Sequence, residues 1–201
     1  MMQEILLQTT WQEWLGVAFS MIQVLLAHDN NPLNYLFGII GVSLTLYVMQ
    51  ASGLYAECGL NVYYLVMSIF GWLNWLRKQQ SSYLAISKSN RRDWSITAAI
   101  VIGSFTLSVL ILHYFTDSQV PVFDAAVSAF AWAGMWLMAK RKLENWILLN
   151  ISNLLAIPLM VYKELYLYAF LSVFLFIVAV FGYRNWRRIM QKGHDTAGEL
   201  I

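Results

Sequence analysis

The sequence predicts an all-α, polytopic membrane protein with seven transmembrane helices. Of its 201 residues, 59% are hydrophobic and 12% are charged, whereas soluble domains average about 45–50% and 25%. The apolar residues fall into seven windows, each near the roughly 20 residues that cross a hydrocarbon core. Lys and Arg gather after the third, fifth and seventh windows, which is typical of a chain that crosses a membrane several times.

Each window is expected to be a helix, because backbone polar groups cannot stay unpaired in lipid. The windows lie at residues 11–28, 32–52, 54–76, 94–116, 120–139, 145–162 and 164–186. The preceding MMQEILLQTT segment lacks the cationic start and small-residue cleavage site of a signal peptide. We therefore expect the first window to be a true span.

The cations predict the orientation, because Lys and Arg stay on the cytoplasmic side during insertion. They cluster after the third, fifth and seventh windows, at Arg77, Lys78, Lys88, Arg91, Arg92, Lys140, Arg141, Lys142, Arg184, Arg187, Arg188 and Lys192. Of 13 cations, only Lys163 lies on the other side. The N-terminus is thus predicted outside and the C-terminus in the cytoplasm, and the clusters indicate topology rather than nucleic-acid binding.

An internal repeat aligns residues 11–77 with 122–188 at an offset of 111 residues, without a gap. The two copies share a Phe-Gly-aromatic-x-Asn-Trp string and an Asn-aromatic pair, at 70–75 and 181–186 and at 34–35 and 145–146. Three crossings end on the opposite membrane face, so two directly repeated units would run in opposite directions. The window at 94–116 adds a crossing and restores the direction, which predicts parallel halves in a 3+1+3 arrangement.

Parallel repeats are a known transporter architecture, with the substrate near the membrane midplane between the halves. The predicted organisation has a first three-helix repeat, a cytoplasmic loop, a linking helix, a second three-helix repeat and a cytoplasmic tail, at 11–77, 78–93, 94–116, 120–188 and 189–201. Two structural halves with no path between them would give the same pattern.

The third window carries a stripe of polar and aromatic residues that share one helical face at 100° per residue. Its members are Glu57, Asn61, Tyr64, Ser68, Trp72 and Trp75. Because polar groups facing lipid are costly, the stripe is expected to line a protein interior. Hydrogen bonding between helices alone would also explain it.

Other windows add polar groups that suit a small solute. They are Ser20 and Gln23 in the first, Asp124, Ser128, Trp132 and Trp136 in the fifth, and Asn150, Ser152 and Asn153 in the sixth. Aromatic faces and amides suit a flat, hydroxylated ligand that is neutral or singly cationic. No Lys or Arg lies at membrane depth to bind a phosphate. Glu57 and Asp124, near the outer ends, could attract a cation or only bond nearby backbone.

Enzyme, cofactor and metal functions are not predicted. The sequence has no phosphate-binding Gly-rich loop, HExxH motif or GxSxG elbow. The single cysteine, Cys58, excludes an intramolecular disulfide and a multi-cysteine metal site. No carboxylate is expected near the midplane, which favours a uniporter over an ion-coupled carrier.

Three strings resemble the PnuC family of vitamin transporters: Leu54–Trp72, Lys142–Trp146 and Gly182–Trp186. The resemblance implies uptake of nicotinamide riboside across the bacterial inner membrane by facilitated diffusion, with cytoplasmic phosphorylation trapping the product. It also implies the 3+1+3 topology and a homotrimer. The implied substrate residues are Asn61, Tyr64, Ser68, Trp72, Asn150 and Asn153, beside which Trp132, Asp124 and Glu57 are further candidates.

The sequence departs from the family at two of these positions. Nicotinamide riboside carriers tend to have Gln where this chain has Asn61, and often Asn where it has Ser68. Relatives of the same fold carry thiamine or riboflavin, so these solutes are alternatives within the family. An alternative of another class is a membrane receptor or assembly subunit that binds a solute without transporting it.

Overall fold

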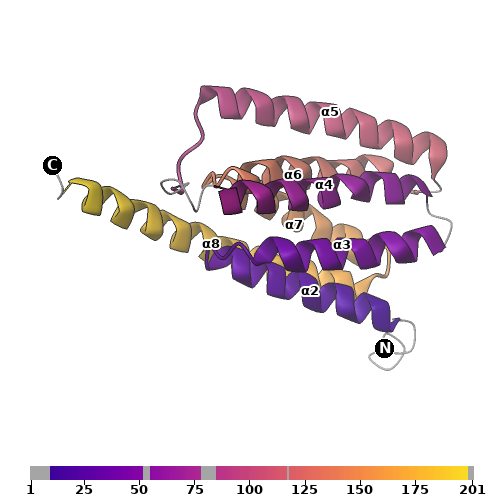
Figure 1. The fold of residues 1–201 in the computed structure, drawn as a ribbon. Coiled ribbons are helices and arrows are strands. Elements are labelled where there is room, and N and C mark those ends of the chain that lie inside the picture. Colours follow the sequence, from indigo (N-terminus) through magenta and orange to yellow (C-terminus); the bar gives the residue numbers. More distant parts are fainter. Residues whose placement is uncertain (1–9, 52–54, 78–84, 117, 199–201) are drawn as a thin grey trace.

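The computed structural model describes residues 10–51, 55–77, 85–116 and 118–198, without the side chains of 48–49, 51, 55–60, 77 and 193–198. Within these ranges the chain forms seven helices and no strand (Figure 1). They are α2 (Trp11–His28), α3 (Asn34–Ala51), α4 (Tyr55–Arg77), α5 (Arg91–Phe115), α6 (Pro121–Ala139), α7 (Asn145–Tyr162) and α8 (Tyr166–Gly198). Each of the seven predicted windows contains one of these helices.

Two helices extend beyond their predicted bounds by three residues or more. α5 begins at Arg91 rather than 94, because Asn90 and Asp93 form a capping box in which each side chain accepts from the other's backbone N–H. α8 continues past residue 186 to Gly198, through a segment without proline and rich in helix-forming Arg, Met, Gln and Lys. Most of the tail predicted at 189–201 is therefore helical.

Four helices of the described part are long and apolar enough to cross a membrane: α5, α6, α7 and the Tyr166–Lys192 stretch of α8. α3 contains a shorter apolar stretch, Asn34–Tyr47. α2 has 18 residues, or about 27 Å at 1.5 Å per residue, and it contains the polar residues Gln12, Glu13 and Gln23. The structure thus supports four of the seven predicted spans by length and composition.

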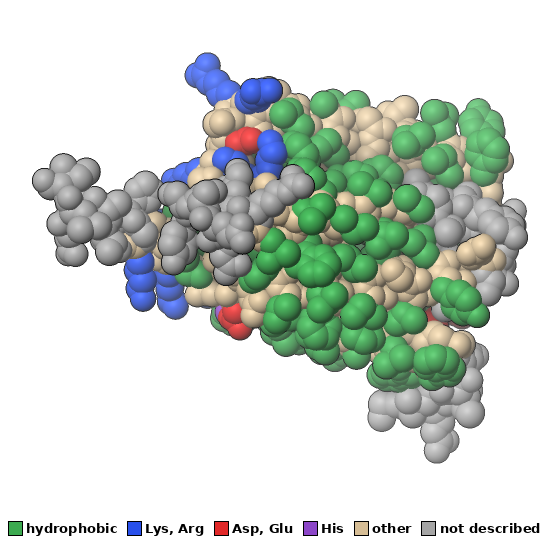
Figure 2. All heavy atoms as spheres, viewed as in Figure 1, with side chains coloured by type: hydrophobic (Ala, Val, Ile, Leu, Met, Phe, Trp, Pro, Cys, Tyr) green, Lys and Arg blue, Asp and Glu red, His purple; other side chains and the backbone are tan. Residues whose placement is uncertain are grey.

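Hydrophobic side chains cover most of the face seen in Figure 2, and Lys and Arg side chains gather at the end that holds the C-terminus. This end, where α4, α6 and α8 finish, is called the cationic end below. Exposed apolar residues such as Ile102, Phe115 and Phe170 would face water in a soluble protein. A lipid environment explains both the apolar band and the charged end.

Six helices form a closed ring of neighbours, and the seventh lies outside it. α2 packs against α3 and α8, α4 against α3 and α6, and α7 against α6 and α8. α5 packs mainly on the outer side of α6 (Figure 1). The ring therefore has an inner space bounded by α2, α3, α4, α6, α7 and α8.

The segment before α5 is fixed to the turn between α6 and α7. Ser87 pairs with Lys142 through a short parallel bridge, and the Ser89 N–H and hydroxyl donate to the Glu144 carboxylate at 2.8 and 2.7 Å. Lys142 also lies 3.1 Å from the Asp93 carboxylate. These contacts hold the start of α5 beside α6.

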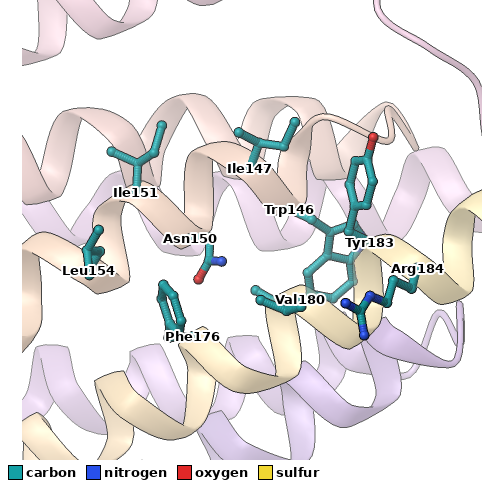
Figure 3. A pocket seen from close by; sticks show the side chains of 10 residues that line it. Trp146, Ile147, Asn150, Ile151, Leu154, Phe176, Val180, Tyr183 and Arg184 are labelled. Atoms are coloured by element: carbon teal, nitrogen blue, oxygen red, sulfur yellow. The ribbon is translucent and has the colours of Figure 1, made fainter.

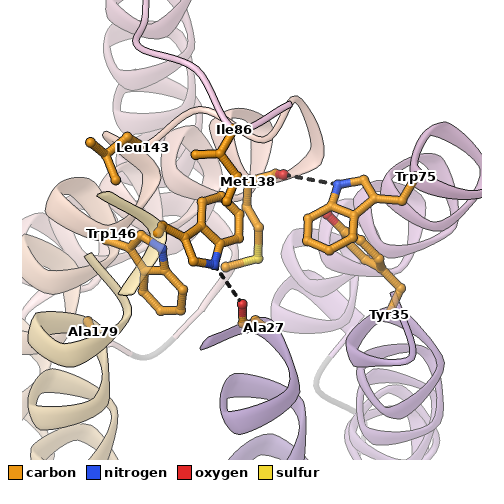
Figure 4. Packing of buried hydrophobic residues seen from close by; sticks show 9 residues of the cluster. Ala27, Tyr35, Trp75, Ile86, Met138, Leu143, Trp146 and Ala179 are labelled. Atoms are coloured by element: carbon orange, nitrogen blue, oxygen red, sulfur yellow. Dashed lines mark hydrogen bonds between the residues drawn. The ribbon is translucent and has the colours of Figure 1, made fainter. Parts of the chain in front are cut away.

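A cluster of buried tryptophans joins the helices at the cationic end (Figure 4). The Trp75 Nε1–H donates to the Met138 carbonyl at 3.3 Å, and the Trp186 Nε1–H donates to the Ala27 carbonyl at 2.9 Å. Each indole thus belongs to a helix of one repeat and donates to the last turn of a helix in the other repeat.

The preceding asparagines repeat this exchange. Asn74 donates to the Ala139 carbonyl at 2.7 Å, and Asn185 donates to the His28 carbonyl at 2.9 Å. Donors and acceptors alike are 111 residues from their counterparts. We call these four hydrogen bonds the Trp clamp, because they join residues 11–77 to residues 120–188 twice.

The glycines of the repeated string allow close packing beside the Trp clamp. A Cβ atom at Gly182 would lie 2.7 Å from the Trp146 ring, and one at Gly71 would overlap the Tyr35 ring. The repeated Phe-Gly-aromatic-x-Asn-Trp string therefore combines a close helix contact with two hydrogen-bond donors one turn later.

Candidate substrate-binding site

A cavity of about 220 Å³ lies inside the ring of six helices and is lined by residues of all six. Its polar lining residues are Ser20, Gln23, Tyr35, Tyr64, Ser152 and Asn153, and the rest are aliphatic residues, methionines and Trp146. Small-molecule sites usually measure roughly 300–1,000 Å³, so the cavity suits a small solute. No charged side chain of the described part lines it.

Two of the polar side chains already donate hydrogen bonds to backbone carbonyls. The Ser20 hydroxyl donates to the Gly16 carbonyl at 2.8 Å, and the Ser152 hydroxyl donates to the Val127 carbonyl at 2.8 Å. The amides of Gln23 and Asn153 and the phenols of Tyr35 and Tyr64 can meet a solute. Amides both donate and accept, and phenols can do the same, so the cavity can bind a polar molecule that is neutral or singly cationic.

Of the predicted site residues, Tyr64 and Asn153 line this cavity. Trp132 lies behind Tyr64, with their ring centres 6.5 Å apart in an edge-to-face arrangement. It also stacks on Tyr63 at 4.3 Å, and the Tyr63 hydroxyl donates to the Trp132 carbonyl. Trp132 therefore supports the wall of the cavity rather than lining it.

The other α4 candidates lie outside the lining. Ser68 is fully buried, Trp72 packs against the tryptophan cluster, and Asn61 is half-buried. All three share the α4 stripe with Tyr64, but only Tyr64 reaches the cavity. The side chain of Glu57 lies outside the described residues.

Asn150 and Asn153 are separated by the structure. Asn150 lies in a second, more open groove of about 310 Å³ between α7 and α8 (Figure 3), with Ile147 and Leu154 exposed beside it. Arg184 lies at one end of this groove. The two asparagines, which were predicted to share one helical face, therefore line different spaces: Asn150 the outer groove and Asn153 the central cavity.

Asp124 forms an ion pair near the end opposite the cationic end. Its carboxylate lies 2.6 Å from Lys163 Nζ and accepts from the Ser118 hydroxyl at 2.6 Å. Lys163, the one cation outside the clusters, therefore has a structural partner. The interpretation that Asp124 bonds nearby groups is favoured over attraction of a cationic solute, because its charge is already paired.

The structure adds cavity residues that were not candidates. Gln23 is a polar residue of the first window, and Tyr35 belongs to the repeated Asn-aromatic pair. Neither observation predicts that these side chains share a cavity with Asn153. Met135, Met138 and Leu175 also line the space. Their apolar side chains are typical of any buried helix, so the sequence carried no signal for them.

A family model described as nicotinamide mononucleotide transporter matches residues 10–188. The chain is similar to the nicotinamide riboside transporter PnuC of Escherichia coli K12, with 22% identity over 88% of this chain and 85% of that one. It is 24% identical to the protein of that name in Neisseria mucosa, over 91% of this chain and 74% of the other.

Among solved structures, the crystal structure of the vitamin B3 transporter PnuC has a similar fold. Its TM-score is 0.72 at 23% identity, over 90% of this chain and 83% of that chain. With the apolar helices, these similarities identify a multi-pass inner-membrane transporter and not an enzyme. The chain belongs to the PnuC family, whose matching model is described as nicotinamide mononucleotide transporter.

Proposed function

We propose that this chain takes up nicotinamide riboside across the bacterial inner membrane by facilitated diffusion. The observation that carries the proposal is the central cavity, which presents amides and aromatic rings but no charged side chain of the described part. Two relatives that align with most of the chain are named nicotinamide riboside transporters. A nicotinamide ring suits aromatic contacts, and ribosyl hydroxyls suit amides.

The cavity favours the riboside over the mononucleotide in the family description. A phosphate needs a cationic or otherwise strong hydrogen-bonding partner when it leaves water. Among the described residues, Arg184 lines the outer α7–α8 groove instead of the cavity. A phosphorylated solute would therefore lose its hydration without gaining a counter-charge.

The proposed topology is 3+1+3, with parallel repeats at 11–77 and 120–188, the N-terminus outside and the C-terminus in the cytoplasm. The ring of six helices with α5 outside it supports this arrangement. The Trp clamp also supports it, because each half gives the other the same two hydrogen bonds. The positive-inside rule then assigns the cationic end to the cytoplasm.

In this topology the cavity lies between the halves, and transport exposes it alternately to either membrane face. The Trp clamp lies between the cavity and the cytoplasm. Its hydrogen bonds must break or rearrange for the solute to leave on that side. No coupling ion is proposed, since the described cavity lining has no carboxylate.

Thiamine and riboflavin remain alternatives, and so does a receptor that binds without transport. A homotrimer is also proposed, and light scattering of the detergent-purified protein measures its mass.

Thermal-shift titration against nicotinamide riboside, nicotinamide mononucleotide, thiamine and riboflavin tests the substrate, because a ligand of the folded state raises its stability. Only nicotinamide riboside is expected to give a saturable shift.

Proteoliposomes separate transport from binding. Radiolabelled nicotinamide riboside is expected to equilibrate across the bilayer without an ion gradient and to be inhibited by unlabelled solute. Binding without equilibration would favour the receptor, and accumulation that requires a gradient would contradict facilitated diffusion. A saturable shift with thiamine alone would replace the substrate while leaving the family assignment in place.

A further inference from the structure

We propose that the Tyr35 hydroxyl and the Trp146 Nε1–H donate hydrogen bonds to the transported solute. Both residues line the central cavity and lie in the first turn of their helices, α3 and α7. They would act as a pair of specificity-determining residues at the cationic end of the cavity. The inference rests on the proposed function, because it assigns contacts within the same transport site.

The first reason is that both donors are buried without a protein partner. Tyr35 is 2% exposed and Trp146 is 1% exposed. In the part of the chain that the structure describes, neither the Tyr35 hydroxyl nor the Trp146 Nε1 has a hydrogen-bond partner. Buried polar atoms are nearly always satisfied in proteins. Trp146 also lines the outer α7–α8 groove, and the central cavity is the space that it shares with Tyr35.

The second reason is that both rings are held in place. The Tyr35 ring packs edge to face on Trp75 with centres 5.0 Å apart, and the Trp146 ring packs the same way on Trp186 at 5.6 Å. On the other side the rings contact Gly71 and Gly182, where a Cβ atom would not fit. A donor fixed before binding loses little conformational entropy when the solute arrives.

The third reason is the position of the two residues in the repeat. Tyr35 and Trp146 are 111 residues apart, so each half supplies one aromatic donor from an equivalent site. Both pack edge to face on the indoles of the Trp clamp. A solute bound to them would therefore contact the two halves at once, next to the bonds that join the halves.

The chemistry of the donors restricts the solute. An indole N–H can only donate, and a phenol with its hydrogen directed into the cavity donates as well. The solute must present hydrogen-bond acceptors at this end, such as ribosyl hydroxyls or a carboxamide carbonyl, and not a cationic group. Nicotinamide riboside carries several acceptor oxygens, whereas thiamine has one hydroxyl and the ring nitrogens of its pyrimidine.

The test compares Tyr35→Phe and Trp146→Phe with matched controls. Tyr183→Phe removes a phenol from a ring that packs on the same cluster but lines the outer groove. Trp136→Phe removes a buried, unpartnered indole N–H that does not line the cavity. Calorimetry measures the affinity of each detergent-purified variant for nicotinamide riboside, and thermal unfolding confirms that each is folded.

Tyr35→Phe and Trp146→Phe are each expected to weaken binding by about fivefold or more, the effect of one lost hydrogen bond. The controls should stay within twofold of the wild type. Wild-type affinity in either cavity variant would overturn the proposed pair. If the wild type binds thiamine or riboflavin instead, the substrate assignment fails, and the same comparison is made with that solute.

A second measurement does not depend on how well Trp146→Phe folds. In a spectrum of ¹⁵N-labelled indoles, Trp146 is identified by elimination, as the N–H signal that is left after single substitutions have assigned the other eight tryptophans. Adding nicotinamide riboside is expected to shift the Trp146 signal and leave the Trp136 signal in place. An unshifted Trp146 signal at saturating solute would contradict the hydrogen bond.

Discussion

Weakening the Trp clamp should open the cavity to the cytoplasm more often. Asn74→Ala and Asn185→Ala each remove one hydrogen bond between the two halves, at 2.7 Å to the Ala139 carbonyl and 2.9 Å to the His28 carbonyl. Both donors are half-buried and outside the cavity lining. The substitutions therefore change the contact between the halves without removing a solute contact.

The size of the effect follows from the hydrogen bonds that are lost. A neutral hydrogen bond contributes about 1 kcal/mol net. If the clamp forms only in the cytoplasm-closed state, each substitution shifts the closed-to-open equilibrium by about fivefold. The two asparagines lie on different helices and donate to different carbonyls, so the double variant is expected to shift the equilibrium by about 25-fold.

Cysteine accessibility measures this shift. Cys58 is replaced by Ala, and the single thiol is placed at Ala27, which is 1% exposed and whose carbonyl accepts the Trp186 bond. A membrane-impermeant thiol reagent is then applied to inside-out vesicles. The labelling rate should rise about fivefold in each single variant and further in the double variant.

Ser172→Ala is the matched control, because the Ser172 hydroxyl donates to the Tyr168 carbonyl within α8 and does not join the halves. Its labelling rate should equal that of the parent. A double variant that labels within twofold of the parent would refute the clamp as a cytoplasmic closure. Equal increases in the control and the clamp variants would indicate general loosening instead.

Other substitutions test the remaining contacts. Gly182→Ala should destabilise the protein by about 1–3 kcal/mol, since its Cβ would lie 2.7 Å from the Trp146 ring; Gly103→Ala, with no atom within 4 Å, should not lower the thermal midpoint. Asn153→Ala should weaken nicotinamide riboside binding by about 1 kcal/mol, whereas Asn150→Ala should leave calorimetric affinity unchanged because Asn150 lies outside the cavity. Lys163→Gln should lower the free energy of unfolding by at most about 1 kcal/mol, since the ion pair with Asp124 is partly exposed. The substitution should not alter solute affinity. A tenfold loss of affinity would place Asp124 in the transport path.

The positions of the helices could be predicted from the sequence because each one depends on its own composition. Runs of apolar residues near membrane length identified all seven helices, and polar stretches such as 29–31 and 140–142 separate neighbouring runs. The start of α5 was placed three residues late because Arg91 and Arg92 interrupt the apolar pattern, although the Asn90–Asp93 capping box starts the helix there.

The site could be predicted only in part, because helical periodicity gives the face of a helix and not its neighbour. Tyr64 and Ser68 share one face of α4, but Tyr64 lines the cavity and Ser68 is buried between helices. Asn150 and Asn153 are one turn apart, yet the edge of the α7–α8 contact falls between them. Which residues share a space depends on six packed helices, and a pattern in one helix does not contain that information.

The two repeats are symmetric at the Trp clamp and asymmetric in the lining of the cavity. At the Trp clamp the halves make the same bonds with the same residue types, so either half can close on the other. At the cavity the equivalent positions have diverged: Tyr35 corresponds to Trp146, and Gln23 and Asn153 have Gly134 and Val42 as their counterparts. A symmetric closure around an asymmetric lining suits a solute with two chemically different ends. Nicotinamide riboside, with an aromatic amide at one end and a hydroxylated sugar at the other, has this asymmetry.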